Sequence, residues 1–91
     1  MAITLGSLNG SCQDLINQVV TAENLGYEAA WFGDTGYPDP LTLSGQVLAA
    51  TNNIDLGIAV VPAYSRTPAV LASSTGTLND LSQGRFILGL G

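Results

Sequence analysis

Few side chains in this sequence could take part in chemistry, and the best placed of them is Asp34. It ends the aromatic-rich run YEAAWFGD, residues 27–34, which is typical of a strand, and the turn-forming run TGYPDP follows directly. A carboxylate at such a point can face a ligand, and it can also simply accept backbone N–H groups of the turn. Thr35, beside it, can orient a hydroxyl group but cannot shuttle a proton near neutral pH.

The other reactive groups are one thiol and two guanidinium groups, and we expect structural roles for them. Cys12 lies near the start of a predicted helix, where a thiol pKa can fall, but a small half-buried residue near a helix cap is the simpler interpretation. Arg85 follows the helix stop at Gly84, so we expect it at the bottom of a barrel, paired with an acid or a helix C-terminus. Arg66 precedes a helix on the same side as Asp34, where a phosphate or substrate contact is the alternative to a structural role.

Composition excludes several classes of function. The sequence has no histidine and one cysteine, which removes a histidine triad, the commonest zinc ligand and an internal disulfide, and we predict no metal site. The sequence contains seven acidic residues, two arginines and no lysine, which gives a net charge of -5. This charge would repel a phosphate backbone, so we predict no nucleic-acid partner. No apolar run reaches the roughly 18 residues of a membrane span, and a signal peptide is not evident, which favours a cytoplasmic protein without a membrane partner.

The elements that must position these residues alternate along the chain. With 91 residues, 46% hydrophobic and 10% charged, the sequence is typical of one small ordered domain. Cap residues, glycine stops and apolar periodicity predict strands and helices in turn. The expected elements are a strand at 3–8, a helix from a cap at Ser11 to a stop at Gly26, a strand at 27–34, a helix at 41–51 after Asp39 and Pro40, a strand at 54–61, a helix from Thr67 and Pro68 to Gly84, and a strand at 85–91.

This alternation implies a parallel sheet with right-handed crossovers. A doubly wound sheet would favour a glycine-rich phosphate loop after its first strand, but GSLNGS carries its glycines, Gly6 and Gly10, at the wrong spacing. A (β/α) barrel needs no such loop and binds ligands at the C-terminal ends of its strands. Trp31, inside a predicted strand, is expected to pack under the helices in the core.

Five segments together resemble a known family. They are AENLGYEAAWFGD, PDPL, AATNNIDLG, YSRTPAVLA and TLNDLSQGRFILGLG, and their order and spacing span essentially the whole chain. The sequence resembles the N-terminal part of the bacterial luciferase-like superfamily, and within it the oxidoreductases that use the deazaflavin coenzyme F-420. The resemblance implies an α/β fold in which residues 1–91 form a single parallel half-barrel, the first four strands and three helices of a TIM (β/α)8 barrel.

The resemblance also implies a function. Family members bind an isoalloxazine-like ring at the C-terminal strand ends and transfer a hydride to or from C5 of F-420, or use FMN for monooxygenation, with small-molecule substrates. The expectation is therefore a flavin- or deazaflavin-dependent oxidoreductase, present as an N-terminal fragment that is inactive alone. The family's phosphate-binding segments lie beyond this half, and no catalytic residue is assigned.

The resemblance places several residues at the coenzyme. Asp34 matches a family acid beside the pyrimidine end of the ring, and its frequent histidine neighbour is replaced here by Thr35. Ala59 and Val60 match a strand bulge with a non-prolyl cis peptide that supports one face of the ring. Gly91, the last residue of GLG, is expected either to line the ligand site or to allow close backbone approach.

Half a barrel leaves an energetic problem, because its interior layers are half empty and its first and last strands are open edges. We therefore expect a homo-oligomer, a complementing C-terminal half, or a longer parent enzyme. The alternative function is a non-catalytic, self-assembling half-barrel module.

Overall fold

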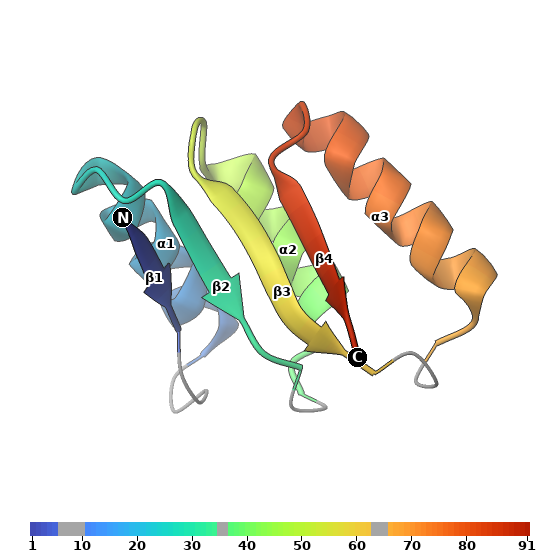
Figure 1. Ribbon diagram of the computed structural model, residues 1–91. Coiled ribbons are helices and arrows are strands. Elements are labelled where there is room, and N and C mark those ends of the chain that lie inside the picture. Colours follow the sequence, from blue (N-terminus) through green and yellow to red (C-terminus); the bar gives the residue numbers. More distant parts are fainter. Residues whose placement is uncertain (6–10, 35–36, 63–65) are drawn as a thin grey trace.

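The computed structural model describes residues 1–5, 11–34, 37–62 and 66–91. Strands and helices alternate along the whole chain, as the sequence predicts (Figure 1). The elements are β1 (Ala2–Thr4), α1 (Cys12–Asn24), β2 (Ala29–Phe32), α2 (Pro40–Ala50), β3 (Asp55–Val61), α3 (Pro68–Ser82) and β4 (Phe86–Leu90).

All four strands differ in extent from their predicted ranges, β3 by one residue at its start, β4 by one residue at each end, and β1 and β2 by more. β1 begins at Ala2, one residue before the predicted start, and residues 6–8 of the predicted strand lie outside the described residues. β2 begins at Ala29; the N–H of Tyr27 donates to the carbonyl of Ala22 and closes the end of α1, while Glu28 already donates its N–H to the carbonyl of Met1 at 2.7 Å. A residue whose N–H is used to end a helix cannot use it in a sheet ladder.

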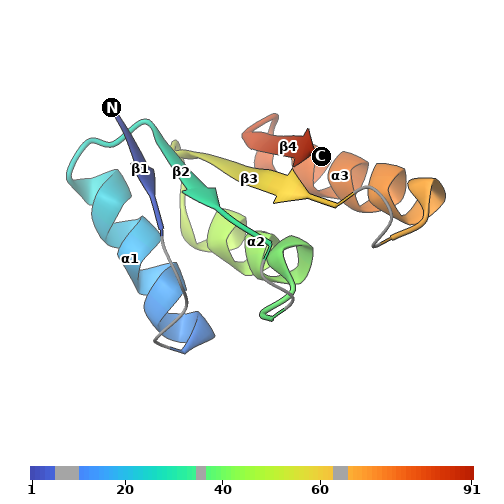
Figure 2. The same ribbon diagram turned by 60° about the horizontal axis from the view of Figure 1, so that its bottom comes forward.

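The four strands form one parallel sheet in the order β1-β2-β3-β4. All three helices lie on one face of this sheet (Figure 2), as right-handed crossovers require. The core fills the space between the helices and this face. Its fully buried members, with 0 to 1% of their surface exposed, are Val19, Ala30, Val47, Ile54, Leu56, Ile58 and Val61.

The helix starts and stops follow the predicted signals. Ser11 caps α1 in a reciprocal capping box, while Asp39 and Thr67 cap α2 and α3, each followed by a proline at the first helical position. Gly26 and Gly84, the predicted stops, have backbone φ angles of +92° and +86°, a region that residues other than glycine rarely adopt. Local sequence therefore accounts for the helix boundaries.

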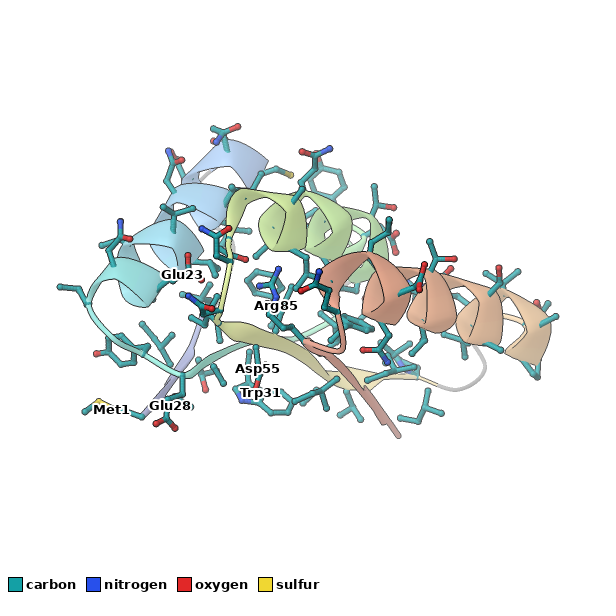
Figure 3. The ribbon with its side chains drawn as sticks, turned by 90° about the horizontal axis from the view of Figure 1, so that it is seen from above. Met1, Glu23, Glu28, Trp31, Asp55 and Arg85 are labelled. Atoms are coloured by element: carbon teal, nitrogen blue, oxygen red, sulfur yellow. The ribbon has the colours of Figure 1, made fainter. Side chains whose placement is uncertain are left out.

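Trp31 lies on the opposite face of the sheet from the helices, so the prediction that it packs under them is wrong (Figure 3). Side chains alternate along a strand, and its neighbours Ala30 and Phe32 are the buried ones. The Trp31 ring covers Gly57 of β3, since a Cβ atom on Gly57 would lie 2.3 Å from ring atom Cζ3. We call the sheet face without described helices the inner face.

Arg85 closes the C-terminal end of α2. Its guanidinium donates to the carbonyl oxygens of Leu48 at 2.9 Å, Thr51 at 3.2 Å and Ile54 at 2.9 Å. It also donates from Nε to the carbonyl oxygen of Ser82 in α3, at 3.0 Å. The expected pairing of Arg85 with a helix C-terminus is confirmed, and it satisfies carbonyl groups that the end of a helix leaves without partners.

Glu23 stabilises the same turn, between α2 and β3, by accepting hydrogen bonds from the backbone N–H groups of the turn. One carboxylate oxygen accepts from the backbone of Asn52, Asn53 and Ile54 at 2.9, 2.6 and 2.9 Å. Burial by itself would raise the pKa of Glu23, but these three hydrogen bonds and the charge of Arg85 outweigh it, so the pKa is lowered. Figure 3 shows Glu23 and Arg85 on the helix side of the sheet.

Candidate functional site

A bulge interrupts β3 at its C-terminal end. Ile58 pairs with Leu88 and Val61 with Leu90, so Ala59 and Val60 together oppose the single residue between those partners on β4. Strand alternation would bury Val60 and expose Val61, yet Val60 is 50% exposed and Val61 is fully buried. The bulge therefore turns Val60 outward where an unbroken strand would turn it toward the helices.

The peptide bond between Ala59 and Val60 is cis, as the family resemblance implies. This part of the prediction is confirmed. Both side chains are exposed. Contact of Ala59 and Val60 with a coenzyme stays a prediction.

Three glycines from two segments lie beside the bulge, Gly33 after β2 and Gly89 and Gly91 at the end of β4. A Cβ atom on Gly33 would lie 3.9 Å from the Ala59 carbonyl oxygen, and one on Gly89 only 2.9 Å from the Ile58 carbonyl oxygen. Gly91 approaches Val60 in the same way, with 3.0 Å from its Cβ position to Val60 Cγ1. The approaches at Gly89 and Gly91 leave little room for a side chain, whereas the distance at Gly33 is an ordinary van der Waals contact.

We call Gly33, Ala59, Val60, Gly89 and Gly91 the bulge surface. It combines three glycines, an alanine and a valine, so its side chains are small and apolar. Such a surface can support a flat, apolar group. Gly91 also donates its N–H to the Val61 carbonyl oxygen at 3.2 Å, which supports its expected role in close backbone approach, whereas its role in lining a ligand site stays a prediction.

Asp34 directly follows Gly33 of the bulge surface and is held by an arginine. Its Oδ2 accepts from Arg66 Nη1 at 3.0 Å, and the other terminal nitrogen of Arg66 donates to Asp39 Oδ1. Exposed fractions are 8% for the Asp34 side chain, 18% for Arg66 and 43% for Asp39. We call these three residues the Arg66 cluster.

Charge and hydrogen bonding within the Arg66 cluster shift two pKa values. The hydrogen bonds to Asp34 and Asp39 raise the pKa of Arg66 above its ordinary value. For Asp39, burial acts to raise the pKa, but hydrogen bonds from Thr42 and Arg66 outweigh it and the pKa is lowered. The cluster is thus a set of paired charges.

The sequence predicts that Asp34 and Arg66 lie on one side, but it does not predict the ion pair between them. Their separation of 32 positions is outside any local pattern. The pair could have been inferred from position, because Asp34 and Arg66 each follow the C-terminal end of a predicted strand. Thr35, the other residue expected at this point, lies outside the described residues.

Within residues 1–5, 11–34, 37–62 and 66–91, no three His, Cys, Asp or Glu side chains come together as a metal site. None of the helices in the same ranges is both long and apolar enough to cross a membrane. Cys12, at the first position of α1, is a free and partly buried thiol.

The chain belongs to the luciferase-like monooxygenase family, whose model matches residues 3–91. It is 44% identical over 71 residues to a 5,10-methylenetetrahydromethanopterin reductase from Methanolobus tindarius, a match that covers 77% of this chain and 22% of the relative. It is 34% identical over 89 residues to an F-420-dependent glucose-6-phosphate dehydrogenase from Intrasporangium calvum, covering 87% of this chain and 27% of that enzyme.

Solved structures agree with the fold. The coenzyme F-420-dependent tetrahydromethanopterin reductase from Methanopyrus kandleri superposes with a TM-score of 0.88 at 28% identity, covering 99% of this chain and 26% of that one. The oxygenating component of a diketocamphane monooxygenase from Pseudomonas putida, solved with FMN, gives the same TM-score at 21% identity, over 99% of this chain and 28% of that one. The predicted fold class, part of a (β/α)8 barrel, is confirmed, and the chain spans about a quarter of the length of these relatives.

Proposed function

We propose that this chain forms part of the coenzyme site of a flavin- or deazaflavin-dependent oxidoreductase, with the bulge surface against the ring of the coenzyme. The observation that carries the proposal is the bulge surface itself, a group of small apolar residues at the C-terminal ends of β2, β3 and β4. Ligands of parallel α/β barrels bind at these strand ends. The names of the relatives favour coenzyme F-420, with FMN as the alternative.

The residues of the bulge surface fit a flat ring system. Val60 presents an apolar side chain that is 50% exposed, and Gly91 beside it adds no side chain to obstruct a ring. Asp34 directly follows Gly33 of the bulge surface in the sequence, and we expect Asp34 and Thr35 to contact polar groups at the ring's edge. A planar apolar ring gains most from contact with a matching flat apolar surface, with a few polar groups to fix its orientation.

Bound there, F-420 or FMN would supply hydride transfer, and FMN also oxygen chemistry, to a small-molecule substrate. The chain's own contribution would be to orient the ring and exclude water from the face that rests on Ala59 and Val60. Asp34 would act through its charge and as a hydrogen-bond acceptor. We propose the cytoplasm as the compartment of this chemistry.

A titration of the purified protein with coenzyme F-420, and separately with FMN, tests the proposal through the change in ring fluorescence. Val60→Gln places a longer polar side chain on the bulge surface and is expected to weaken binding several-fold. Val70→Gln is the matched control, because Val70 on α3 has the same exposed fraction of 50%. Its affinity should equal that of the unmodified protein.

Two results would contradict the proposal. One is the absence of any fluorescence change with either coenzyme at high micromolar concentration. The other is equal weakening by Val60→Gln and Val70→Gln, which would place the ring elsewhere or indicate a general loss of structure.

We also propose a protein partner that covers the inner face, either a second copy of this chain or a complementing C-terminal half. Supporting this, β1 and β4 are the outer strands of the sheet, and the inner face carries the large side chains of Trp31 and Ile87. Ile87 is 42% exposed. Outer strands offer unpaired backbone groups to a further strand, and an apolar sheet face favours burial against another layer.

A further inference from the structure

We propose that Arg66 is a positioning residue, which fixes the Asp34 carboxylate beside the bulge surface by tying it to the Asp39 cap of α2. The inference rests on the proposed function, in which Asp34 contacts the coenzyme. It concerns the conformation of Asp34, however, and this can be measured without any coenzyme.

The geometry of Arg66 suits this role. Each terminal nitrogen of its guanidinium bonds a different carboxylate, Nη1 that of Asp34 and Nη2 that of Asp39. A planar guanidinium holds two such partners in a fixed relation, whereas the single ammonium of a lysine acts as a point charge. The arginine thus fixes direction as well as charge.

The second carboxylate of the Arg66 cluster is itself anchored. Asp39 Oδ2 accepts from the backbone N–H of Thr42 at 3.0 Å, which fixes Asp39 to the first turn of α2. Arg66 directly precedes Thr67, the cap of α3. Asp34 is therefore held through Arg66 by the beginnings of two helices, which are more rigid than a loop.

Burial indicates that this contact is not a loose surface ion pair. The Asp34 side chain is 8% exposed and that of Arg66 is 18% exposed. An ion pair screened by solvent contributes little and holds no fixed geometry, whereas one largely covered by protein is screened much less. Asp34 directly follows Gly33 of the bulge surface in the sequence, so under the proposed function the geometry of the pair would affect a ligand bound there.

The conformation of Asp34 can be read from its three-bond Hα–Hβ couplings in the NMR spectrum of the full chain. In the unmodified protein we expect either one large and one small coupling or two small ones, since both patterns indicate a single rotamer and differ from averaged values. Arg66→Gln should give two averaged couplings. Arg85→Gln is the matched control, because it removes the sequence's other cation, at the opposite end of α2, and should leave Asp34 in one rotamer.

Arg66→Lys separates positioning from simple charge balance. If Arg66 only neutralised the two acids, lysine would restore the single rotamer, and that result would overturn the proposal. We expect the couplings to stay averaged. Averaged couplings in the unmodified protein, or a single rotamer in Arg66→Gln, would overturn it as well.

One further measurement needs no variant. The two terminal NH2 groups of Arg66 should give separate, slowly exchanging signals, because each is bound to a different carboxylate. A single averaged signal at low temperature would contradict the proposal even if Arg66→Gln fails to fold.

Coenzyme binding provides an independent test of the positioning role. Where the unmodified protein binds coenzyme F-420 or FMN, Arg66→Gln should weaken affinity on the order of tenfold, by disordering a charged hydrogen-bonding group. If neither coenzyme binds but the couplings of Asp34 depend on Arg66, then the proposed function fails while the positioning role stands.

Discussion

Trp31 and Gly57 form a contact on the inner face that leaves no room for a larger residue. A Cβ atom on Gly57 would lie 2.3, 2.4 and 2.7 Å from ring atoms Cζ3, Cε3 and Cη2 of Trp31. The ring would have to move off the strand. We therefore expect Gly57→Ala to lower the free energy of unfolding by about 1 to 3 kcal/mol, the usual cost of overpacking.

Urea unfolding followed by the fluorescence of Trp31, the only tryptophan, measures this change. Gly76→Ala is the control, since nothing lies within 4 Å of that Cβ position on α3. It should raise stability by up to about 1 kcal/mol through helix propensity. Equal effects of the two substitutions would show that the Trp31 contact carries no energy.

Glu23 should make stability depend on pH. Its pKa is lowered in the folded protein from an ordinary value of 4.5. Its contribution is therefore fully present above about pH 4.5, and it is lost as the pH falls through the lower folded value. We expect the free energy of unfolding to fall less steeply with acidification below pH 4.5 in Glu23→Gln than in the unmodified protein.

The measurement is chemical denaturation at a series of pH values. Glu28→Gln serves as the comparison, because the Glu28 side chain is 85% exposed in its ion pair with the N-terminus. Exposed pairs of this kind contribute little. If Glu23→Gln and the unmodified protein have parallel pH profiles, the three backbone hydrogen bonds do not depend on the charge of Glu23.

At the scale of elements, α2 depends on a residue outside itself for its C-terminal end. Arg85 donates to the carbonyls of Leu48 in α2, of its C-cap residue Thr51 and of Ile54 just beyond it. Arg85→Met keeps much of the apolar stem but leaves these acceptors without that donor. We expect a loss of about 2 to 3 kcal/mol of stability, the cost of unsatisfied buried polar groups.

Thermal unfolding gives the overall loss, and hydrogen exchange locates it. Faster exchange should concentrate in the last turn of α2 and in the turn before β3. Arg66→Met changes the other arginine in the same way and should leave exchange in that last turn unchanged. Uniform acceleration along the chain would indicate that Arg85 does not act on α2 in particular.

Elements could be predicted from sequence where the determining signal is local. The caps Ser11, Asp39 and Thr67 and the stops Gly26 and Gly84 act within a few residues of the boundary they set. Their types are sufficient to identify them. The order of strands and helices, and from it the parallel sheet, followed from these boundaries.

Contacts between distant segments could not be predicted in the same way. Glu23 meets backbone groups 29 to 31 positions away, and Arg66 meets Asp34 across 32 positions. Trp31 was misplaced because its aromatic character indicates burial but not which face of the strand it occupies. The bulge at Ala59 and Val60 came from the family resemblance, since no local pattern in GIAVV predicts it.

At the scale of the whole molecule, the inner face should control the association of the chain. One chain has a mass of 9.3 kDa, and light scattering of the purified protein is expected to give a larger native mass. Ile87→Lys places a charge on the inner face of β4 and should reduce the native mass to that of a single chain, because burying an unpaired charge is costly.

Leu81→Lys is the matched control, since Leu81 is 75% exposed on α3, outside the inner face. It should leave the native mass unchanged. Dissociation by Leu81→Lys but not by Ile87→Lys would place the interface on the helices. A monomeric unmodified protein would contradict self-association. The complementing C-terminal half would then be tested by mixing it with this chain.

The bulge in β3 also determines which side of the sheet the side chain of Val61 occupies. Because two residues occupy the space of one, Val61 returns to the helix side, where it is fully buried. A regular strand that kept both Ala59 and Val60 would turn Val61 to the inner face and forfeit about 1.5 to 3 kcal/mol of burial. Deleting one of the two would leave a single residue between Ile58 and Val61, which would keep Val61 on the helix side. The extra residue in β3 therefore enlarges the apolar surface at the strand end without changing the side of the sheet that Val61 occupies, and its deletion should remove part of that surface while the core beneath it stays intact.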